Sequence, residues 1–217
     1  MALPFAQWVD LMRFERLDNF QHEVWTIGWK FTDNSAEAWT ARFCAFKDKN
    51  PVAVRAAAAV LPVAVSRSIQ FNTKGVVVGA ISSRKTALEP ADPVAVLGSA
   101  VAKQLGWPWM PALISKKVHK PLHGIYNSSE RDAEVANAYT AMKLPPSVGY
   151  VLIVDDFVTR GSTLDDAARA VAVAAGHPIT FGGLALAKTE RVNWAGNVGI
   201  SNSHVPERLA VQWDAVQ

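Results

Sequence analysis

One segment of the chain combines residue types that could bind a phosphorylated sugar. Residues 151–164, VLIVDDFVTRGSTL, place an apolar run directly before two adjacent carboxylates, Asp155 and Asp156. The apolar run predicts a buried strand, and open α/β sheets bind ligands at the carboxyl ends of their strands. We therefore expect the two carboxylates to lie at a ligand site, where they suit sugar hydroxyls or a hydrated divalent cation.

The loop that follows has the features of an anion site. Residues 159–163 (TRGST) contain hydroxyl groups, a glycine and a basic side chain, and they lead directly into a predicted helix. Unpaired backbone N–H groups and the helix dipole favour phosphate at such a helix start. Arg160 either adds a charged donor or points to solvent. An ordinary strand end with a capped turn is the alternative, but the whole arrangement favours a sugar phosphate bound together with Mg²⁺.

Two further segments supply cations. The loop after the first predicted core strand contains Ser82, Ser83, Arg84 and Lys85, whose two basic groups suit a diphosphate. The alternative for this loop is an ordinary polar connection between a strand and a helix. Residues 116–124 (KKVHKPLHG) form a second basic stretch, of a kind that is usually a solvated loop.

The strand, the paired aspartates and the T-x-G-S-T loop resemble the signature for phosphoribosyl pyrophosphate (PRPP) in the type I phosphoribosyltransferases. The resemblance implies that Asp155 and Asp156 are the catalytic residues and contact the ribose hydroxyls, directly or through water bound to Mg²⁺. It also implies a binding loop for the 5-phosphate of PRPP. That loop comprises Val158, Thr159, Arg160, Gly161, Ser162 and Thr163.

The same resemblance assigns roles to the other basic segments. Ser82, Ser83, Arg84 and Lys85 would bind pyrophosphate. Lys116, Lys117 and Lys120 would belong to a flexible lid that closes over PRPP and excludes water. Thr159 stands where purine-salvage members carry an acid proposed as the general base, which disfavours hypoxanthine-guanine activity.

A closer likeness covers residues 40–190. Phe46-Lys47 before an alanine-rich helix, the segments SSER and NAY, and VDDFVTRGSTLDDAARAV are similar to the ComF family of phosphoribosyltransferase-like proteins, which are associated with DNA uptake. Members of that family typically begin with a cysteine-rich zinc module, whereas this chain has the single cysteine Cys44. The N-terminal region is therefore expected to differ from that module, and a role in DNA uptake does not follow from the likeness.

The expected fold is α/β and similar to the type I phosphoribosyltransferases, with a central, mostly parallel sheet flanked by helices and a smaller N-terminal β-containing hood. Residues 1–50 are assigned to the hood, and residues 51–217 to the core with a C-terminal extension. Short apolar runs alternate with helical stretches in the core. The pattern predicts strands at 76–81, 112–114, 150–154 and 179–187, and helices at 92–105, 130–142 and 162–175.

The N-terminal region has a different pattern. Segments 24–31 and 36–46 are β-prone and flank the turn formers TDNS, which predicts a hairpin. An alanine-rich helix over 52–61 is expected to end at Pro62. The tryptophans of this region are interpreted as core or hood packing.

Composition limits the classes of protein. The 217 residues suffice for one α/β domain, and 50% apolar with 19% charged residues is a globular composition. The net charge of +3 is too weak for a general polyanion binder, so nucleic-acid binding is disfavoured but stays an alternative. The longest apolar run, 56–65, is shorter than the roughly twenty residues of a membrane span. We expect a soluble, cytoplasmic protein, because a single cysteine fits a reducing compartment.

The leading hypothesis is an Mg²⁺-dependent phosphoribosyltransferase, in which a nitrogenous acceptor attacks C1 of PRPP as pyrophosphate leaves. Arg84, Lys85 and the metal would stabilise the departing diphosphate. The alternative is a non-catalytic protein that senses PRPP or a nucleotide, or a ComF-like accessory factor in DNA uptake. The sequence leaves open the acceptor and whether the chain forms a homodimer.

Overall fold

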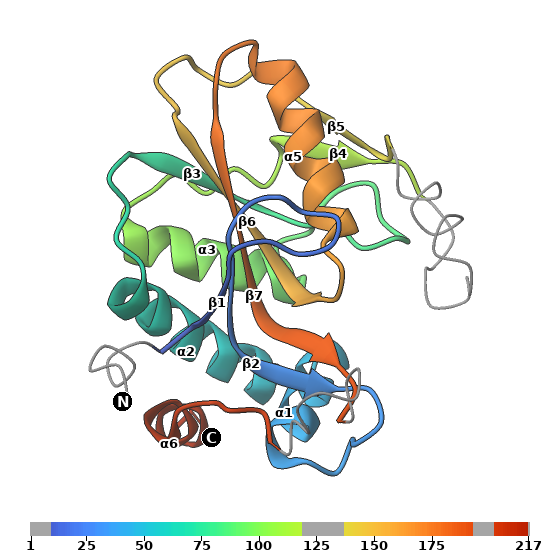
Figure 1. Cartoon of the computed structure of the whole chain (residues 1–217), viewed down its shortest axis with the longest axis vertical. Coiled ribbons are helices and arrows are strands. Elements are labelled where there is room, and N and C mark those ends of the chain that lie inside the picture. The colour runs from blue at the N-terminus through green and yellow to red at the C-terminus, as the bar shows by residue number, and fades with distance from the viewer. Residues whose placement is uncertain (1–9, 119–136, 193–201, 217) are drawn as a thin grey trace.

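The computed structural model describes residues 10–118, 137–192 and 202–216. Its centre is a five-stranded sheet with the order β1-β2-β7-β6-β3 (Figure 1). β1 runs antiparallel to β2, and all the other neighbouring strands are parallel. The sheet is therefore mostly parallel, as predicted. Its strands are β1 (Met12–Phe14), β2 (Val24–Phe31), β3 (Gly75–Gly79), β6 (Tyr150–Val158) and β7 (Thr180–Glu190).

Helices cover both faces of this sheet (Figure 1). Val77 and Leu152 belong to the apolar cluster on one face, whereas Val78 and Ile153 belong to the cluster on the other. A strand that is buried on both faces has a continuous run of apolar residues. This is why β3 and β6 could be predicted from the sequence. The first face is packed by α1 (Ala38–Lys47), α2 (Pro51–Ser68), α3 (Pro93–Leu105) and α6 (Glu207–Asp214). The second is packed by α5 (Ser162–Ala175) and a two-stranded antiparallel sheet of β4 (Ile114–Lys116) and β5 (Tyr139–Ala141).

The elements around the predicted phosphate loops agree with the sequence. β3, α3, β6, α5 and β7 match the predicted segments in order and type. β6 continues to Val158. Asp155 and Asp156 therefore lie in the C-terminal half of the strand rather than after its end. The strand expected at 112–114 is displaced: β4 lies outside the main sheet, and Trp109 makes an isolated parallel bridge to Val77 instead.

The predicted hairpin of segments 24–31 and 36–46 is wrong. The first segment is β2, but the second is the helix α1, and β2 pairs in parallel with β7. Trp39, Phe43 and Phe46 are buried on one face of α1, since they are spaced three and four residues apart. This helical spacing decides the structure of the segment, although aromatic residues favour strands. Residues before and after position 50, such as Trp25 and Leu61, share one apolar cluster.

Helix α2 does not end at Pro62, as the sequence had suggested. A proline inside a helix removes one backbone hydrogen bond, but here α2 packs against α1, α3 and α6, and this packing offsets the loss. Within the described part of the chain, α2 is also the one helix long and apolar enough to cross a membrane. Its buried residues, including Leu61 and Val65, lie in the core instead.

The predicted helix over 130–142 is wrong at its C-terminal end, where residues 139–141 form β5. The carboxylate of Asp166 on α5 accepts hydrogen bonds from the backbone N–H groups of Asn137, at 2.9 Å, and Tyr139, at 2.8 Å. These contacts hold the backbone of this segment extended beside α5. The first part of the predicted helix lies outside the described residues.

Candidate functional site

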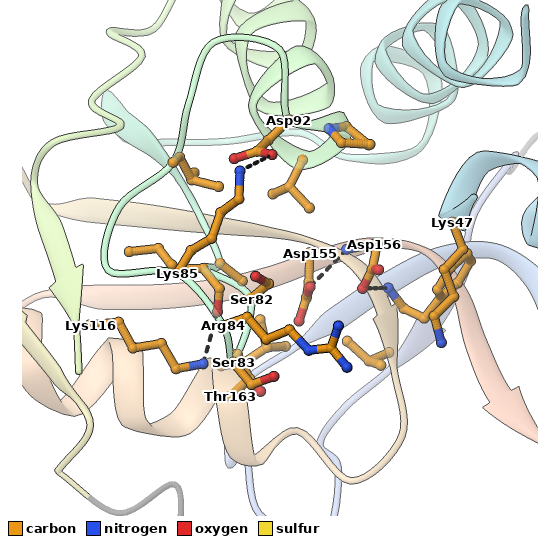
Figure 2. Close-up of a pocket in the computed structure, with 18 of the residues that line it drawn as sticks. Lys47, Ser82, Ser83, Arg84, Lys85, Asp92, Lys116, Asp155, Asp156 and Thr163 are labelled. Atoms are coloured by element: carbon orange, nitrogen blue, oxygen red, sulfur yellow. Dashed lines mark hydrogen bonds and ion pairs between the residues drawn. The ribbon is translucent and has the colours of Figure 1, made fainter. Parts of the chain in front are cut away.

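A pocket of about 820 Å³ lies where β3 and β6 end, and Figure 2 shows its lining. The carboxyl ends of parallel strands are the usual place of ligands in open α/β sheets. The structure brings three predicted segments together here: the loop 82–85, the pair Asp155 and Asp156, and the loop 158–163. Lys116 lines the same pocket.

The two carboxylates are partly exposed at the wall of the pocket. The Oδ1 atom of Asp155 accepts a hydrogen bond from the backbone N–H of Asp156 at 2.8 Å, and Oδ1 of Asp156 accepts one from Phe157 at 2.7 Å. Burial, followed by the neighbouring Asp156 carboxylate, raises the pKa of Asp155 well above its ordinary value. Neither carboxylate forms an ion pair with a described residue. A bound cation or sugar hydroxyls would replace the hydrogen bond that the two carboxyl groups make with each other.

The start of α5 forms the second wall. Gly161 is the N-cap residue with φ +86°, and a Cβ atom there would lie 2.7 Å from Cβ of Phe20, so the position requires glycine. Gly161 has no side chain that could itself cap this helix. The backbone N–H groups of its first turn have no intrahelical acceptor, and Ser162 and Thr163 line the pocket. Such a helix start suits a phosphate group.

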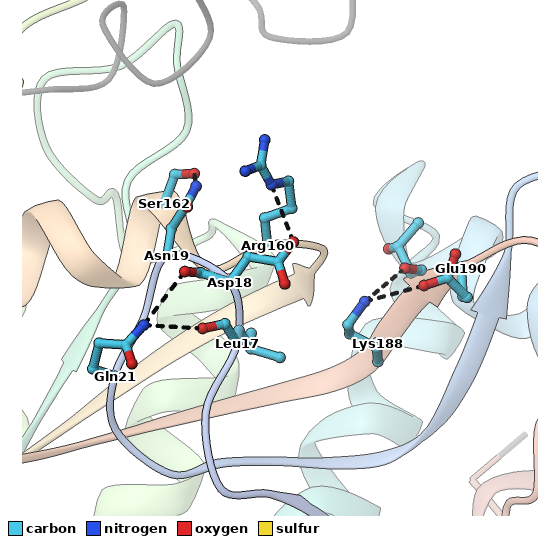
Figure 3. Close-up of polar contacts among 9 residues, drawn as sticks. Leu17, Asp18, Asn19, Gln21, Arg160, Ser162, Lys188 and Glu190 are labelled. Atoms are coloured by element: carbon cyan, nitrogen blue, oxygen red, sulfur yellow. Dashed lines mark hydrogen bonds and ion pairs between the residues drawn. The ribbon is translucent and has the colours of Figure 1, made fainter. Parts of the chain in front are cut away.

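An N-terminal segment braces this loop (Figure 3). The backbone N–H of Asn19 donates to the carbonyl oxygen of Arg160 at 2.9 Å, and its side-chain Nδ2 donates to Oγ of Ser162 at 2.6 Å. The guanidinium Nε of Arg160 lies 3.2 Å from the Asp18 carboxylate. The sequence left open whether Arg160 contacts phosphate or solvent, and the structure pairs it with Asp18.

The loop 82–85 presents its two cations differently. Nζ of Lys85 lies 2.7 Å from Asp92 and 3.1 Å from Glu89, and the hydrogen bond to Asp92 raises its pKa. Arg84 is exposed, makes no hydrogen bond or ion pair to a described residue, and points into the pocket in Figure 2. Of the two predicted diphosphate ligands, Arg84 is therefore the one that is not already paired with acids.

The sequence interpretation missed three charged residues of the pocket: Lys47, Lys49 and Asp92. Lys47 ends α1, and Lys49, with φ +61°, follows in the turn to α2. Nζ of Lys49 lies 3.9 Å from Asp92, the residue that precedes α3, and Asp92 also binds Lys85. Only the Phe46-Lys47 likeness offered a signal for any of them. Lys49 and Asp92 come from separate elements that the fold brings to the pocket, so no local sequence motif could have indicated them.

Lys116 lies in β4 and is only 5% exposed, rather than in a mobile loop as predicted. Its Nζ atom donates to the carbonyl oxygen of Ile81 at 2.8 Å and lies 4.8 Å from the centre of the Tyr139 ring in β5. Burial lowers the pKa of Lys116 to about 8, although nearby Asp155 acts in the opposite direction. Lys117 is exposed and does not line the pocket. Lys120 lies outside the described residues.

The donor set fits an Mg²⁺ ion that is shared with a phosphate ligand. Mg²⁺ commonly uses one or two carboxylates together with phosphate oxygens of the substrate, and Asp155 with Asp156 offers that pair. In the ranges 10–118, 137–192 and 202–216, no cluster of three or more His, Cys, Asp or Glu side chains could hold a metal by itself. The ligand would therefore have to supply the remaining oxygens.

No protein-family model matches this chain, and no curated protein matches it significantly. The resemblance to the type I phosphoribosyltransferases and to ComF proteins therefore rests on the motifs themselves. The structural features that bear on function are those of the pocket: its paired carboxylates, the helix start at Gly161 and its cations.

Proposed function

We propose that this protein is a type I-like phosphoribosyltransferase, which binds PRPP with Mg²⁺ and transfers the ribose 5-phosphate group to a nitrogenous acceptor. The observation that carries the proposal is the meeting of three features in one pocket: Asp155 with Asp156, the start of α5 at Gly161, and the 82–85 loop. They correspond to the three parts of PRPP, which are the ribose hydroxyls, the 5-phosphate and the diphosphate.

The 5-phosphate would bind at the start of α5. The backbone N–H groups of the first turn donate hydrogen bonds, and the hydroxyl group of Thr163 adds another donor. The bracing by Asn19 keeps this loop in one conformation before the ligand arrives. A preformed loop reduces the conformational entropy that binding would otherwise cost.

The ribose and the diphosphate would lie between this loop and residues 82–85. Asp155 and Asp156 accept hydrogen bonds from the ribose hydroxyls and orient C1 for attack. Mg²⁺, when bound, neutralises the charge that develops on the departing diphosphate. The exposed guanidinium of Arg84 stabilises the same charge, since it has no acidic partner in the described protein.

One observation favours a second function. No histidine, cysteine, tyrosine or glutamate is present among the described residues that line the pocket. The carboxylates among these residues are Asp155 and Asp156, which are assigned to the ribose hydroxyls, and Asp92, which is paired with Lys85, so no separate general base for the acceptor is evident. The same pocket would then bind PRPP or a nucleotide without turnover, as in a sensor or a ComF-like accessory protein.

A pyrophosphate-release assay separates the two functions. The protein is incubated with PRPP, Mg²⁺ and each of a panel of nucleobases. The transferase predicts release with at least one acceptor, and a loss of roughly a hundredfold in rate on replacing Asp155 and Asp156 by asparagine. PRPP binding without turnover on any acceptor supports the sensor. A protein that neither binds nor consumes PRPP contradicts both.

A further inference from the structure

Lys116 is a charged side chain buried in the wall of the pocket. It is 5% exposed, and its Nζ atom lies 2.8 Å from the carbonyl oxygen of Ile81 and 4.8 Å from the centre of the Tyr139 ring. Figure 2 shows Lys116 reaching from β4 toward the side of the pocket where Ser83 and Thr163 lie. Within the part of the chain that the structure describes, it forms no ion pair with a carboxylate.

A buried ammonium group without an anionic partner is costly, unless the protein or a ligand supplies the compensating charge. The carboxylates that act on Lys116 are those of Asp155 and Asp166. Asp166 already accepts hydrogen bonds from Arg169, at 2.8 Å, and from two backbone N–H groups. Burial keeps the hydroxyl of Tyr139 protonated by raising its pKa, so Tyr139 adds no negative charge. The pocket itself is then the place from which an anion would reach Lys116.

Lys116 also contacts both ends of the 82–85 loop. Its ammonium group donates to the carbonyl oxygen of Ile81, immediately before the loop, and its backbone N–H donates to the carbonyl oxygen of Thr86, immediately after it, at 2.9 Å. The hydroxyl of Tyr139 donates to the same Ile81 oxygen at 2.9 Å. Lys116 therefore contacts the backbone on both sides of the 82–85 loop and also places a positive charge at the pocket.

We propose that Lys116 binds the diphosphate group of the ligand, and that the same residue fixes the 82–85 loop where Arg84 reaches that group. This inference rests on the proposed function and adds a specific cation to it. The unpaired ammonium group supplies a charge-assisted hydrogen bond, which the diphosphate completes. Its contacts at Ile81 and Thr86 keep the loop from moving away when the ligand binds.

The test measures the binding of inorganic pyrophosphate, with Mg²⁺ present, by calorimetry on the full chain. Lys116→Met should weaken binding about ten- to a hundredfold, the range expected for a lost hydrogen bond to a charged group. Lys116→Arg keeps the charge and should recover most of the affinity. Lys117→Met is the matched control, because Lys117 is exposed and outside the pocket, and it should bind as the wild type does.

Thermal unfolding separates binding from folding. Lys116→Met removes a buried charge, so the folded variant should melt no lower than the wild type at pH 7. A second measurement needs no variant at Lys116: in protein labelled with ¹⁵N-lysine, pyrophosphate should shift the Nζ resonance of Lys116 and leave that of Lys117 unchanged. This measurement decides the matter if Lys116→Met does not fold.

The outcomes distinguish this inference from the function on which it rests. If the wild type binds PRPP, but a folded Lys116→Met variant binds pyrophosphate equally well, Lys116 is not a diphosphate ligand and the proposed function stands. A Lys116 Nζ resonance that does not move on saturation with pyrophosphate has the same meaning. If the wild type binds neither PRPP nor pyrophosphate, both proposals are overturned.

Discussion

The hydroxyl group of Tyr139 makes two hydrogen bonds to the backbone of Ile81. It donates to the carbonyl oxygen at 2.9 Å and accepts from the N–H group at 2.8 Å, and both residues are buried. Asp166 on α5 in turn accepts the N–H of Tyr139 at 2.8 Å. The two-stranded sheet therefore connects the loop at the end of β3 to the helix that begins at the phosphate loop.

Replacing Tyr139 by phenylalanine should destabilise the protein by about 1–3 kcal/mol, because the buried N–H of Ile81 would lose its acceptor. The free energy of unfolding in urea measures the effect. Tyr150→Phe is the control, since the hydroxyl of Tyr150 makes no hydrogen bond to a described residue. Equal stability of the two variants would show that the bonds to Ile81 contribute nothing.

Replacing Gly161 by alanine should cost more stability than the same change at Gly106. Both glycines have positive φ, +86° and +65°, which costs a residue with a Cβ atom about 1–2 kcal/mol. At Gly106 the added Cβ meets nothing within 4 Å, whereas at Gly161 it meets Cβ of Phe20 at 2.7 Å. The unfolding free energies of the two variants are compared directly. The expectation fails if Gly161→Ala is the milder change.

Raising the pH should stabilise the wild type relative to Lys116→Met. The pKa of Lys116 is about 8 in the folded protein, below its ordinary value of 10.5, so above pH 8 the folded state has lost a proton that the unfolded state still holds. Stability from this group therefore rises with pH across that window. Between pH 7.5 and 9.5 the gain should be about 2 kcal/mol.

The measurement is the free energy of unfolding of both proteins at the two pH values. The comparison with Lys116→Met cancels the groups that do not interact with Lys116, whereas the effect of Lys116 on Asp155 stays part of the measured difference. Lys117→Met, at an exposed position outside the pocket, is measured beside it as the control. A difference between wild type and Lys116→Met that does not change with pH would contradict the lowered pKa.

Much of the fold around the site was predictable, because its signals are local. β3 and β6 are continuous apolar runs, and α3 and α5 each end at a glycine with positive φ, Gly106 and Gly176. The helix α1 was missed because its aromatic residues favour strands, although their spacing is helical. The predicted end of the helix at Pro62 was wrong for a different reason. Contacts with other helices stabilise α2 beyond this proline.

The candidate site was predictable only where its residues are consecutive in sequence. The loop 158–163 and the pair Asp155 and Asp156 could be recognised as motifs. Lys49 and Asp92 reach the pocket from separate elements and meet there, at 3.9 Å, only through the fold. Lys116 was recognised as basic, but nothing in its local sequence indicated that β4 would bury it.

The central claim is that Asp155, Asp156 and the α5 loop bind PRPP. Its most direct test is a calorimetric titration of the protein with PRPP in the presence of Mg²⁺. We predict binding by the wild type and by Glu207→Gln, a control that removes a carboxylate at an exposed position on α6, outside the pocket. Replacing Asp155 and Asp156 together by asparagine should weaken it at least roughly tenfold. The account is contradicted if the wild type does not bind PRPP, or if the double variant binds it equally well.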